Sequence, residues 1–589
     1  MAVIRHISIQ NFRSIRQAEW FPGSGLNCLI GPGDSGKSTF IDAIDLVLGA
    51  RRSFTFSDAD FYLMNSATPV CISVTLGQLD DGLRNLENYG RYLRGFNSET
   101  KEIHDEPLAG DETVLTLRMV VGADLEPDWC LFSERATVEG LEKRLLWKHR
   151  EQLSPTRLGA TSHHHLAWGN RSVLNKLSAE DFDISSTLAE LSRQTRHNFA
   201  ARQLPQLDNI LTEVRTIANE LGVQVGELKA LLDVNGVSLS NSAISLHNSD
   251  NTPLRMLGTG STRLLVSGLQ KAVGGPGIIL VDEAEYGLEP YRISRLLNQL
   301  GSRDDEPTSQ VFITTHSPYV LRELKATQLC VLRKLEQPPP EPSHNFLTLS
   351  GDDKEQATIR ACAEAFFSKA VIVGEGGTEV GFIRGLDLYR QRRGRTGFQD
   401  QGAFATDGGG GDNYFKRAEV FAQLGYRTAL LKDSDITTPA HRQQTEHCRA
   451  SGVTIFEWGN GFSTEGALLA WCPAETIRDI VLLAADLNSH QQVDQHIQNC
   501  SQGAYNFDTC TGEPTEEMRT PVAHAAGKYG WFKTIGKAED LAENIVGPVF
   551  NQFSRHCCKV SDEAAFCLIQ RPYISKTLLT RRISPRGSP

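Results

Sequence analysis

Eight residues near the N-terminus have the types and spacing that are needed to hold a chain of phosphates. They match the pattern G-x-x-x-x-G-K-[ST] and read Gly31-Pro32-Gly33-Asp34-Ser35-Gly36-Lys37-Ser38. The glycines let backbone N–H groups turn toward phosphates, the lysine can reach the β- and γ-phosphates, and the serine hydroxyl can bind Mg²⁺. We therefore predict an ATP site that is formed by Gly31, Gly33, Ser35, Gly36, Lys37, Ser38 and Thr39, with Ser38 as a magnesium ligand.

An apolar segment in the middle of the chain ends in two carboxylates. Residues 278–281 read Ile-Ile-Leu-Val, and Asp282 and Glu283 follow them directly. After a phosphate-binding loop, this pattern predicts a strand whose Asp282 holds the Mg²⁺ and whose Glu283 polarises the attacking water.

Five further carboxylates lie in the second half of the chain at positions that favour metal binding. Glu375 and Glu379 follow an apolar segment and a glycine turn, and both can converge on one ion if Glu379 lies in the first turn of a helix. Asp433 and Asp435 follow another apolar segment, where alternate residues of a strand end point the same way. Glu465 adds a fifth acid, in a turn before a helix. Oxygen ligands without Cys or His favour Mg²⁺ or Mn²⁺, and two such ions about 4 Å apart would activate a water and stabilise the leaving oxygen of a phosphodiester.

The elements that must position these residues follow from the apolar patterns around them. A short apolar strand precedes the glycine-rich loop, and a segment with apolar residues at helical spacing follows it. Strands and helices alternate from residue 370 to about 470, which is typical of an α/β domain. We predict strands at 26–30, 277–281, 310–314, 370–373 and 429–431, a helix at 38–48, and a helical connector at about 353–367.

Prolines mark the boundary between the two halves. Four of the five positions from Pro338 to Pro342 are proline, which can continue neither a helix nor a central strand. Apolar residues at three- and four-residue steps predict helices in 175–245, which fit helical arms and an ordinary packed bundle equally well. We predict an ATPase domain at 1–174 and 246–335 with a helical insert at 175–245, a linker at 336–367, an α/β domain at 368–560, and a partly disordered C-terminal extension at 561–589.

The composition is that of a globular chain of two or three domains, with 40% apolar and 22% charged residues. The net charge of −11 argues against nucleic acid over the whole surface but leaves room for a local basic groove. The 12 cysteines include no C-x-x-C motif, so we expect them to be reduced and mostly structural. No stretch approaches the roughly 18 apolar residues of a membrane span, and no secretory signal opens the chain. We therefore expect a cytoplasmic protein without a membrane partner.

Several segments of the first half resemble ABC-type ATPases. Residues 7–15 and 285–290 are similar to the branch that acts in DNA recombination and repair. Residues 257–263 resemble the ABC signature loop, which opens a helix onto the γ-phosphate of the other protomer's nucleotide and implies a contact at Gly260. Residues 314–318 resemble the switch segment, in which His316 would sense the γ-phosphate. The signature loop lacks its usual Gln-like residue, which argues against efficient head-to-head ATP hydrolysis.

The acids of the second half resemble those of a Toprim domain, in which a glutamate and a D-x-D motif lie at adjacent strand ends. The additional Glu379 and Glu465 look like the nuclease type that is found in the OLD (overcoming lysogenization defect) family. Both halves together resemble OLD-family nucleases over nearly the whole chain, least at about 70–170 and beyond about 540. The resemblance implies metal ligands at Glu375, Glu379, Asp433, Asp435 and Glu465, of which Glu375 is also catalytic.

A downstream lysine neutralises transition-state charge in that family. Lys533 and Lys537 are the two candidates, and we prefer Lys533. Two other features stay open. The arginines at 390, 392, 393 and 395 fit both DNA phosphate contacts and a solvated loop, and the glycines at 408–411 fit both a phosphate approach and a flexible turn.

The resemblance implies an ATPase and Mg²⁺-dependent DNA endonuclease that forms a homodimer or higher oligomer through its helical insert and acts in antiviral defence. Some relatives work alone, and others pair with a helicase or with a reverse transcriptase and its nucleic acid. The main alternative is an ATP-gated DNA-binding or repair ATPase whose Toprim domain is non-catalytic. A topoisomerase would need a tyrosine nucleophile in a separate cleavage domain, and a primase would need a polymerase or zinc-binding segment, and neither is recognisable. ATP could activate cleavage or inhibit it.

Overall fold

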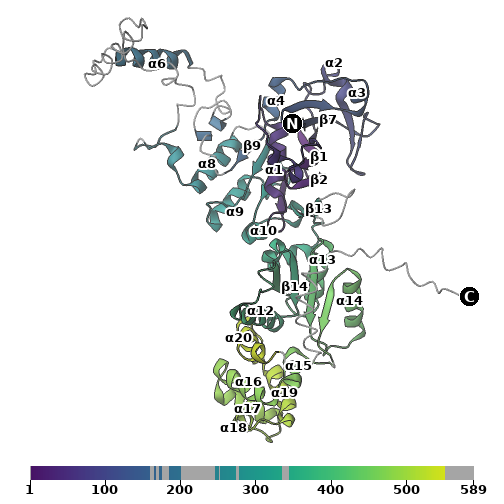
Figure 1. Cartoon of the computed structure of the whole chain (residues 1–589), viewed down its shortest axis with the longest axis vertical. Helices are drawn as coiled ribbons and strands as arrows, with labels where there is room; N and C mark the ends of the chain where they lie inside the picture. The colour runs from purple at the N-terminus through teal and green to yellow at the C-terminus, as the bar shows by residue number, and fades with distance from the viewer. Residues whose placement is uncertain are drawn as a thin grey trace, which may run out of the picture. The chain divides into compact units, whose positions relative to one another are not determined.

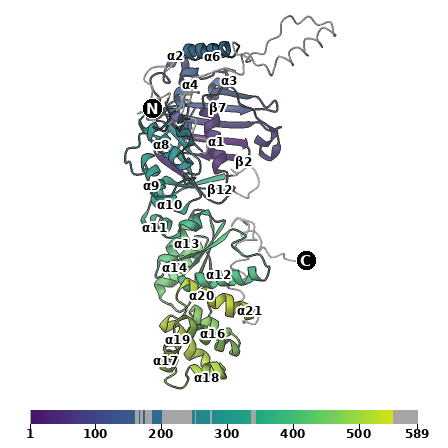
Figure 2. The ribbon, with the colours of Figure 1, turned by 90° about the vertical axis from the view of Figure 1, so that its left-hand side faces the viewer.

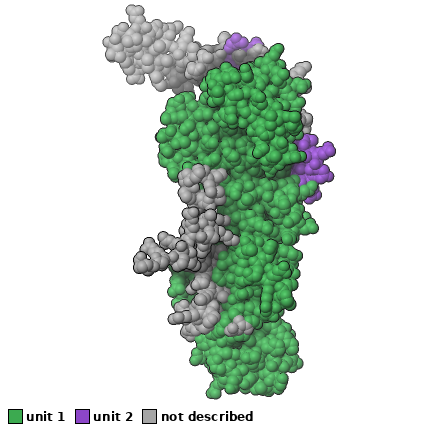
Figure 3. All heavy atoms as spheres, turned by 90° about the vertical axis from the view of Figure 1, so that its right-hand side faces the viewer, with its two compact units in different colours: residues 1–154, 312–589 green, residues 155–311 purple. Residues whose placement is uncertain are grey.

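The computed structural model describes residues 2–159, 165–166, 172–174, 185–200, 246–250, 252–272, 277–334, 344–459 and 461–550. The chain divides into two compact units, the first formed by residues 1–154 and 312–589 and the second by residues 155–311 (Figure 3). Within the described ranges, none of the helices combines the length and apolar character that a bilayer-spanning segment needs.

A seven-stranded sheet forms the N-terminal part of the first unit (Figure 1). Its apolar and polar residues alternate, as in β1, where Ile7 and Ile9 are buried while Ser8 points to the opposite face. The apolar face packs on α1 (Lys37–Leu48). The strand order is β2-β1-β4-β7-β5-β6 with β8 beside β7, and the strands are β1 (Val3–Phe12), β2 (Ile15–Trp20), β4 (Val70–Gly77), β5 (Leu93–Asn97), β6 (Glu102–His104), β7 (Glu112–Val121) and β8 (Pro127–Phe132).

A buried strand, β3 (Leu26–Ile30), leads into the glycine-rich loop and α1. It pairs in parallel with β12 (Leu329–Lys334), whose other edge pairs in antiparallel fashion with β13 (His344–Thr348). The strand β11 (Gln310–Thr314) and the short helix α10 (Pro318–Glu323) precede β12 in the chain. The predicted strand–loop–helix around residues 26–48 and the predicted strand at 310–314 are confirmed.

A four-stranded parallel sheet follows, with the strand order β15-β14-β16-β17. Its strands are β14 (Ala370–Gly374), β15 (Ala403–Asp407), β16 (Arg427–Lys432) and β17 (Thr454–Glu457), and the crossover helices are α12 (Gly377–Arg392), α13 (Asn413–Gln423) and α14 (Pro439–Ala450). The order places β15 and β16 on either side of β14, so right-handed crossovers put α12 on one face and α13 with α14 on the other. The register pairs Gly374 with Asp407 and Leu431, so the carboxyl ends of these strands share one edge.

The helical connector before this sheet is confirmed as α11 (Asp353–Cys362) and a 3-10 turn at Ala363–Phe367. Helices continue the chain after β17, and Figures 1 and 2 show them beyond the sheet, with α20 close to α12. They pack around a core that includes Trp458 and Trp531. They are α15 (Thr464–Trp471), α16 (Ala474–Leu487), α17 (His490–Cys500), α18 (Phe507–Gly512), α19 (Arg519–Tyr529), α20 (Ile535–Leu541), a π-helical segment at Ala542–Val546, and α21 (Gly547–Val549).

Glycines allow α12 and α20 to touch backbone to backbone. A Cβ at Gly381 would lie 2.2 Å from the carbonyl oxygen of Ile535, and one at Gly385 would lie 2.3 Å from that of Glu539. No real Cβ approaches that closely, so these two positions require glycine. The contact fixes the segment before α20 against the first turns of α12.

In the second unit, β9 (Thr156–Leu158) pairs in parallel with β10 (Ile278–Val281), and α8 (Thr259–Ala272) packs on α9 (Pro290–Gln299). Residues 185–200 form α6, as the predicted helical insert requires. The rest of that prediction, at 175–184 and 201–245, lies outside the described residues, as do the proline-rich residues 336–342 and the predicted extension at 561–589.

Candidate functional site

The glycine-rich loop has the backbone that its sequence demands. Gly31 has a φ of 135° and Gly36 a φ of 90°, both in the region that favours glycine. A Cβ at Gly31 would lie 2.5 Å from the carbonyl oxygen of Leu332 in the adjacent β12. The loop therefore stays against the sheet, and α1 begins directly after it at Lys37.

Lys37 is folded back into this loop. Its buried ammonium donates to the carbonyl oxygens of Gly31 at 3.1 Å and Pro32 at 2.8 Å, and to Ser35 Oγ at 3.3 Å. Gly33 and Ser38 are exposed, and Thr39 is half-buried beside them in the chain. The loop thus presents an open side on which phosphate oxygens can replace the carbonyl acceptors of the ammonium.

Arg13 supports the loop's helix and was not singled out from the sequence. Its guanidinium pairs with Asp42 on α1 at 2.5 Å and with Asp60 at 2.9 Å. Arg13 lies in the turn between β1 and β2. The sequence of this segment resembles recombination ATPases, but that resemblance indicated only the class of protein and no role for Arg13. Arg13 therefore ties that turn to the helix that follows the phosphate loop.

The acidic strand end of the second unit is held by a buried arginine. The Arg263 side chain is 1% exposed and donates to the carbonyl oxygens of Asp282, of Glu283 at 2.7 Å, of Tyr286 at 3.1 Å and of Leu158 at 3.2 Å. Glu283 has a φ of 48°, a conformation that non-glycine residues rarely adopt. Arg263 lies in the segment that resembles the signature loop, and its guanidinium fixes the backbone that carries Asp282 and Glu283.

The carboxylates themselves differ in exposure. Asp282 is half-buried and lies 3.7 Å from the Arg157 guanidinium, while Glu283 is exposed. Gly260 lies in the first turn of α8, as the resemblance implies, but it is buried against backbone. A Cβ there would lie 2.2 Å from the carbonyl oxygen of Gly287, which explains the glycine. The predicted nucleotide contact of Gly260 stays a prediction.

His316 follows β11 in the first unit and is exposed. Its ring centroid lies 6.2 Å from that of Phe367, in the turn that leads to β14. The predicted switch histidine thus contacts the segment that enters the four-stranded sheet.

The second group of acids gathers at the carboxyl edge of that sheet. Glu375 follows β14, and its Oε2 accepts from the backbone N–H of Asp433 at 3.0 Å. Glu379 lies in the first turn of α12, which was the condition for its carboxylate to converge with that of Glu375, and its Oε2 accepts from the N–H of Gly376 at 2.8 Å. Three acids from two strand ends and a helix start are thereby brought together.

Thr464, which the sequence analysis did not single out, joins two of these acids. Its hydroxyl lies 2.7 Å from Glu379 Oε1 and 2.9 Å from Asp433 Oδ1, and its backbone N–H donates to the same Oδ1 at 2.9 Å. The indole N–H of Trp458 donates to the hydroxyl at 2.8 Å. One hydroxyl hydrogen cannot serve both carboxylates, so the cluster calls for a further proton or a cation.

The pKa values of these acids also indicate that the cluster needs a further proton or a cation. Burial, followed by the charges of Glu379 and Glu375, raises the pKa of Asp433 to about 8. Burial also raises the pKa of Glu379 to about 7, and burial and the charge of Asp435 raise that of Glu375. The carboxylates repel one another in a desolvated place, which is the arrangement that a bound cation relieves.

Glu465 and Asp435 complete the predicted set in different ways. Glu465 lies in the first turn of α15, one step later than the predicted turn before a helix, because Ser463 caps that helix. It is 4% exposed, and its Oε1 has no hydrogen-bond partner among the described residues. Asp435 is exposed at the edge of the cluster. An unpartnered buried carboxylate oxygen and an all-oxygen donor set both suit Mg²⁺ or Mn²⁺.

The acids are gathered without forming a closed ligand shell. Across the described part of the chain, no three His, Cys, Asp or Glu side chains converge closely enough to hold a metal ion as they stand. Lys432 adds a buried cation beside the cluster, where its Nζ pairs with Glu457 at 3.2 Å and donates to the carbonyl oxygen of Asp433 at 2.9 Å. Sequence reasoning missed this lysine because it ends an apolar strand.

The two candidate lysines point to different places. Lys533 is exposed in the turn before α20, and its backbone lies beside Gly377, where a Cβ would be 3.7 Å from the Lys533 carbonyl oxygen. Lys537 donates to Asn488 Oδ1 at 2.7 Å, between α16 and α17. Lys533 is thus the lysine whose chain segment adjoins the start of α12, two residues from Glu379.

The phosphate loop between β3 and α1 defines an α/β ATPase domain that binds nucleotide. Residues 26–322 match the family described as "AAA domain, putative AbiEii toxin, Type IV TA system", a stretch that covers just over half of the chain. The chain belongs to this family.

Two curated proteins are similar to parts of the chain. The DNA replication and repair protein RecF of Nitrosococcus oceani is 46% identical over 54 residues, which are 9% of this chain and 15% of that protein. The OLD nuclease of Thermus scotoductus is 23% identical over 352 residues, which are 56% of this chain and 62% of that protein. The chain therefore spans less than two thirds of the length of either relative.

Solved SMC head domains cover 59% of the chain at 14% sequence identity. The head of Pyrococcus furiosus, bound to the C-terminal domain of ScpA, is covered over 97% of its length with a TM-score of 0.34. The head of Thermotoga maritima is covered over 99% with a TM-score of 0.28. Superpositions this loose carry no conclusion about function.

Proposed function

We propose that the chain is an ATP-binding, divalent-metal-dependent DNA endonuclease of the OLD type. The ATPase domain would comprise residues 1–174 and 246–335 around the insert at 175–245, and a Toprim nuclease domain would comprise residues 368–560 after the linker at 336–367. The observation that carries the proposal is the cluster of acids at the carboxyl edge of the parallel sheet, around the shared hydroxyl of Thr464. The similarity to the Thermus scotoductus OLD nuclease supports it.

The residues that would hold Mg²⁺ or Mn²⁺ are Glu375, Glu379, Asp433, Asp435 and Glu465. Such ions, when bound, supply a water of lowered pKa and stabilise the leaving oxygen of a phosphodiester. Thr464 would keep Glu379 and Asp433 oriented through its hydroxyl and N–H groups. Glu375 would act in catalysis, since its raised pKa lets it hold a proton at a higher pH than an exposed glutamate does.

The lysine that would neutralise charge on the phosphodiester is Lys533, since it is exposed and its chain segment adjoins α12. Lys537 is engaged with Asn488 and would be structural. The arginines at the C-terminal end of α12 remain candidates for contacts with DNA phosphates, although Arg392 already pairs with Glu543 at 2.7 Å.

In the ATPase domain, Lys37 and Gly31, Gly33, Ser35, Gly36 and Thr39 would bind the ATP phosphates, and Ser38 and Asp282 would hold its Mg²⁺. Glu283 would polarise the attacking water, and His316 would sense the γ-phosphate. Gly260 would face the nucleotide of a second copy, so a homodimer or higher oligomer is part of this proposal. The exposed positions of Ser38, Glu283 and His316 are consistent with these roles.

The test is cleavage of supercoiled plasmid with Mg²⁺ or Mn²⁺, with and without ATP. We expect metal-dependent nicking by the unaltered chain and its loss in Asp435→Ala, whose side chain is exposed and whose removal should not disturb the fold. The matched control is Asp479→Ala, another exposed aspartate, which lies on α16 away from the acids. Cleavage that persists in Asp435→Ala would contradict the assigned site.

A second candidate is an ATP-gated DNA-binding or repair ATPase whose Toprim domain is non-catalytic. The lack of a closed ligand shell in the described residues favours it. It predicts no cleavage with either metal, while ATP hydrolysis and DNA binding persist and both depend on Lys37. The same plasmid assay, run beside an ATPase assay on Lys37→Ala, separates the two candidates.

A role in antiviral defence is also part of the proposal, supported by the OLD-type similarity and by the toxin–antitoxin wording of the family description. A helicase or a reverse transcriptase with its nucleic acid is a candidate partner. Phage plaque counts on cells that carry the unaltered chain or Asp435→Ala test this role, and equal counts would contradict it.

A further inference from the structure

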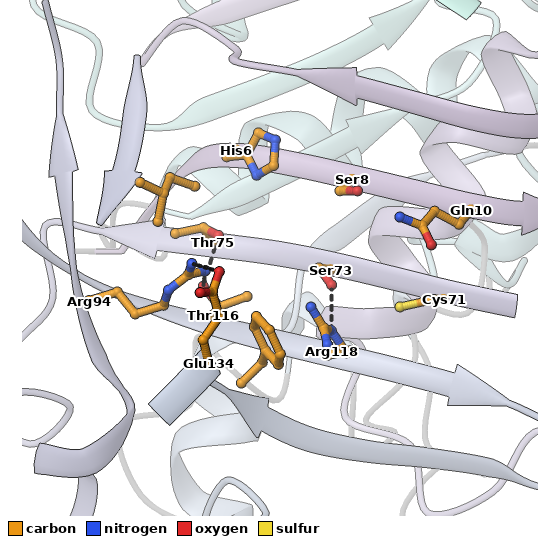
Figure 4. Close-up of a pocket in the computed structure, with 12 residues that line it drawn as sticks. His6, Ser8, Gln10, Cys71, Ser73, Thr75, Arg94, Thr116, Arg118 and Glu134 are labelled. Carbon is orange, nitrogen blue, oxygen red and sulfur yellow. Dashed lines mark hydrogen bonds and ion pairs between the residues drawn. The ribbon is translucent and has the colours of Figure 1, made fainter. Parts of the chain in front are cut away.

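A polar pocket opens on the face of the seven-stranded sheet that is turned away from α1 (Figure 4). Its volume is about 250 Å³, and five strands and the start of α3 (Glu134–Val138) contribute the residues that matter here. The lining combines four hydroxyls with two guanidinium groups, from Ser8, Ser73, Thr75, Thr116, Arg94 and Arg118. None of these residues belongs to the nucleotide or acid clusters.

The hydroxyls and guanidinium groups are already oriented toward one another. Thr75 and Thr116 share a hydrogen bond of 2.9 Å across β4 and β7, and Arg94 donates to Thr116 Oγ1 at 3.3 Å. Arg118 Nε donates to Ser73 Oγ at 3.0 Å. Figure 4 shows these contacts in two groups on neighbouring strands, one at Thr75, Arg94 and Thr116 and the other at Ser73 and Arg118. The pocket is therefore a preformed array of donors on rigid strands.

Arg94 is buried without adequate compensation for its charge. Its side chain is 9% exposed, and its Nε has no hydrogen-bond partner among the described residues. The nearest carboxylates, Asp105 and Glu134, lie 3.6 and 3.9 Å away. Charge-assisted hydrogen bonds to carboxylates are usually about 2.7–2.9 Å long, so both pairs are loose. A buried donor in this state calls for an acceptor inside the pocket.

Arg118 adds a second, half-buried guanidinium group to the pocket. Its guanidinium stacks on the Phe132 ring, 3.1 Å from the ring centroid, and burial lowers the pKa of both Arg118 and Arg94. The nearby His6 is neutral at physiological pH because burial and Arg94 lower its pKa to about 4. The positive charge of the pocket therefore comes from two desolvated guanidinium groups.

We propose that this pocket binds the phosphate group of a small ligand, either inorganic phosphate or a monoester no larger than a mononucleotide. Planar guanidinium forks match phosphate oxygens, and hydroxyls can donate to the remaining oxygens. The volume lies below the roughly 300–1,000 Å³ of pockets for drug-sized ligands, which limits the size of the guest. Glu134 competes for Arg94 at the rim, but its side chain is 72% exposed and can move away.

The test is titration calorimetry of the full chain with inorganic phosphate, with AMP, and with a short DNA duplex, in EDTA. All variants carry Lys37→Ala, so that the phosphate loop contributes little to the heat. We expect phosphate or AMP to bind, and Arg118→Gln to weaken the binding by about tenfold or more. Glu134→Gln should tighten it by about threefold, because a competing carboxylate is removed.

Arg144→Gln is the matched control, since it removes one positive charge from a side chain that is 79% exposed and does not line the pocket. Equal binding by Arg118→Gln and this control, or no effect of Glu134→Gln, would overturn the proposal and make the arginines structural. Binding of the duplex alone would also overturn it, in favour of a surface for the DNA backbone. Should Arg118→Gln fail to fold, the binding measured for Glu134→Gln still distinguishes these outcomes, because Glu134 is exposed.

Discussion

A single hydroxyl hydrogen faces two acids at the carboxylate cluster, and this shortage has a measurable consequence. Thr464 cannot donate to Glu379 and Asp433 at once, and the pKa of Asp433 is raised to about 8 by burial and neighbouring acids. We expect Asp433→Asn to stabilise the metal-free chain by about 1 kcal/mol. Folding must either protonate the Asp433 carboxyl or bury its charge, whereas the amide is already neutral and its oxygen can still accept from Thr464. Thermal unfolding in EDTA measures this gain.

The same variant should lose the response to metal. Added Mg²⁺ should raise the melting temperature of the unaltered chain and leave that of Asp433→Asn nearly unchanged, because a ligand is gone. Asp479→Ala, outside the cluster, is the control and should keep the response. Equal melting temperatures of Asp433→Asn and the unaltered chain in EDTA would show that the acids do not strain the fold.

A half-buried histidine gives the seven-stranded sheet a sensitivity to acid. The pKa of His6 is about 4 in the folded chain, below its ordinary 6.5, because of burial and Arg94. Above pH 6.5 the ring is neutral in both states and contributes nothing. As the pH falls from 6.5 to 4, the unfolded chain gains a proton that the folded chain refuses, so the free energy of unfolding decreases. The loss should be on the order of 2 kcal/mol, since one pKa unit corresponds to about 1.4 kcal/mol and the ring keeps some contact with solvent.

Urea midpoints at pH 7 and pH 4.5 measure this loss. His6→Gln should lose less stability over that range than the unaltered chain, whereas His524→Gln, at an exposed position, should lose as much. A His6→Gln midpoint that falls as far as that of the control would refute the assignment of acid sensitivity to His6.

Among the elements, the contact between α12 and α20 tolerates no added atom. A Cβ at Gly381 would lie 2.2 Å from the Ile535 carbonyl oxygen and 2.7 Å from the Ala538 Cβ. We expect Gly381→Ala to destabilise the chain by about 2 kcal/mol, because overpacking forces the helices apart. It should also weaken any metal-dependent cleavage, since Glu379 starts α12 and Lys533 precedes α20, and it should leave ATP hydrolysis unchanged.

Gly536→Ala is the matched control on α20. No atom lies within 4 Å of a Cβ at that position, so alanine should be neutral or stabilising by up to about 1 kcal/mol. Melting temperatures and activities of the two variants test whether close packing of α12 on α20 stabilises the chain. Equal melting temperatures would show that the helices can move apart without loss of stability.

Local patterns predicted those elements whose geometry is local. The loop before α1 was predicted because its glycines and lysine act within eight residues. The acids were expected to lie together because they resemble those of a Toprim domain, which lie at adjacent strand ends. Thr464 was missed because one threonine carries no pattern, and its partners lie 85 and 31 residues away in the chain. The strands between 70 and 132 were not predicted, because one face of each carries hydroxyl groups and their sequences resemble loops. The role of Arg263 was missed because its partners are backbone carbonyl groups, whose positions cannot be read from the sequence.

On the scale of the whole molecule, the segment after β11 connects the ATPase motifs to the acid cluster within the first unit. His316 contacts Phe367, and Arg322 on α10 pairs with both oxygens of Glu364 at 2.6 and 2.7 Å. Arg322 also donates to the Arg360 carbonyl oxygen at 3.1 Å. A nucleotide that moves His316 would therefore act on the turn that leads into β14.

We expect Arg322→Gln to reduce the effect of ATP on cleavage by up to about fivefold, in whichever direction ATP acts. The size follows from about 1 kcal/mol for a partly exposed ion pair. ATP hydrolysis and ATP-independent cleavage should be retained, because Arg322 belongs to neither site. Plasmid cleavage across an ATP titration measures the effect, with Arg144→Gln as the control, and an unchanged ATP dependence would mean that coupling bypasses α10.

The pairing of β3 with β12 has a consequence for how the chain is made. Cys28 pairs with Leu329, about 300 residues further along the chain. At a synthesis rate of about 5–20 residues per second, β3 leaves the ribosome about 15 to 60 s before that partner exists. During this interval the apolar strand before the phosphate loop has an unpaired edge, which invites aggregation. Nascent chains should therefore depend on chaperones until β12 emerges, and slow codons placed between the two strands should lower the yield of folded protein.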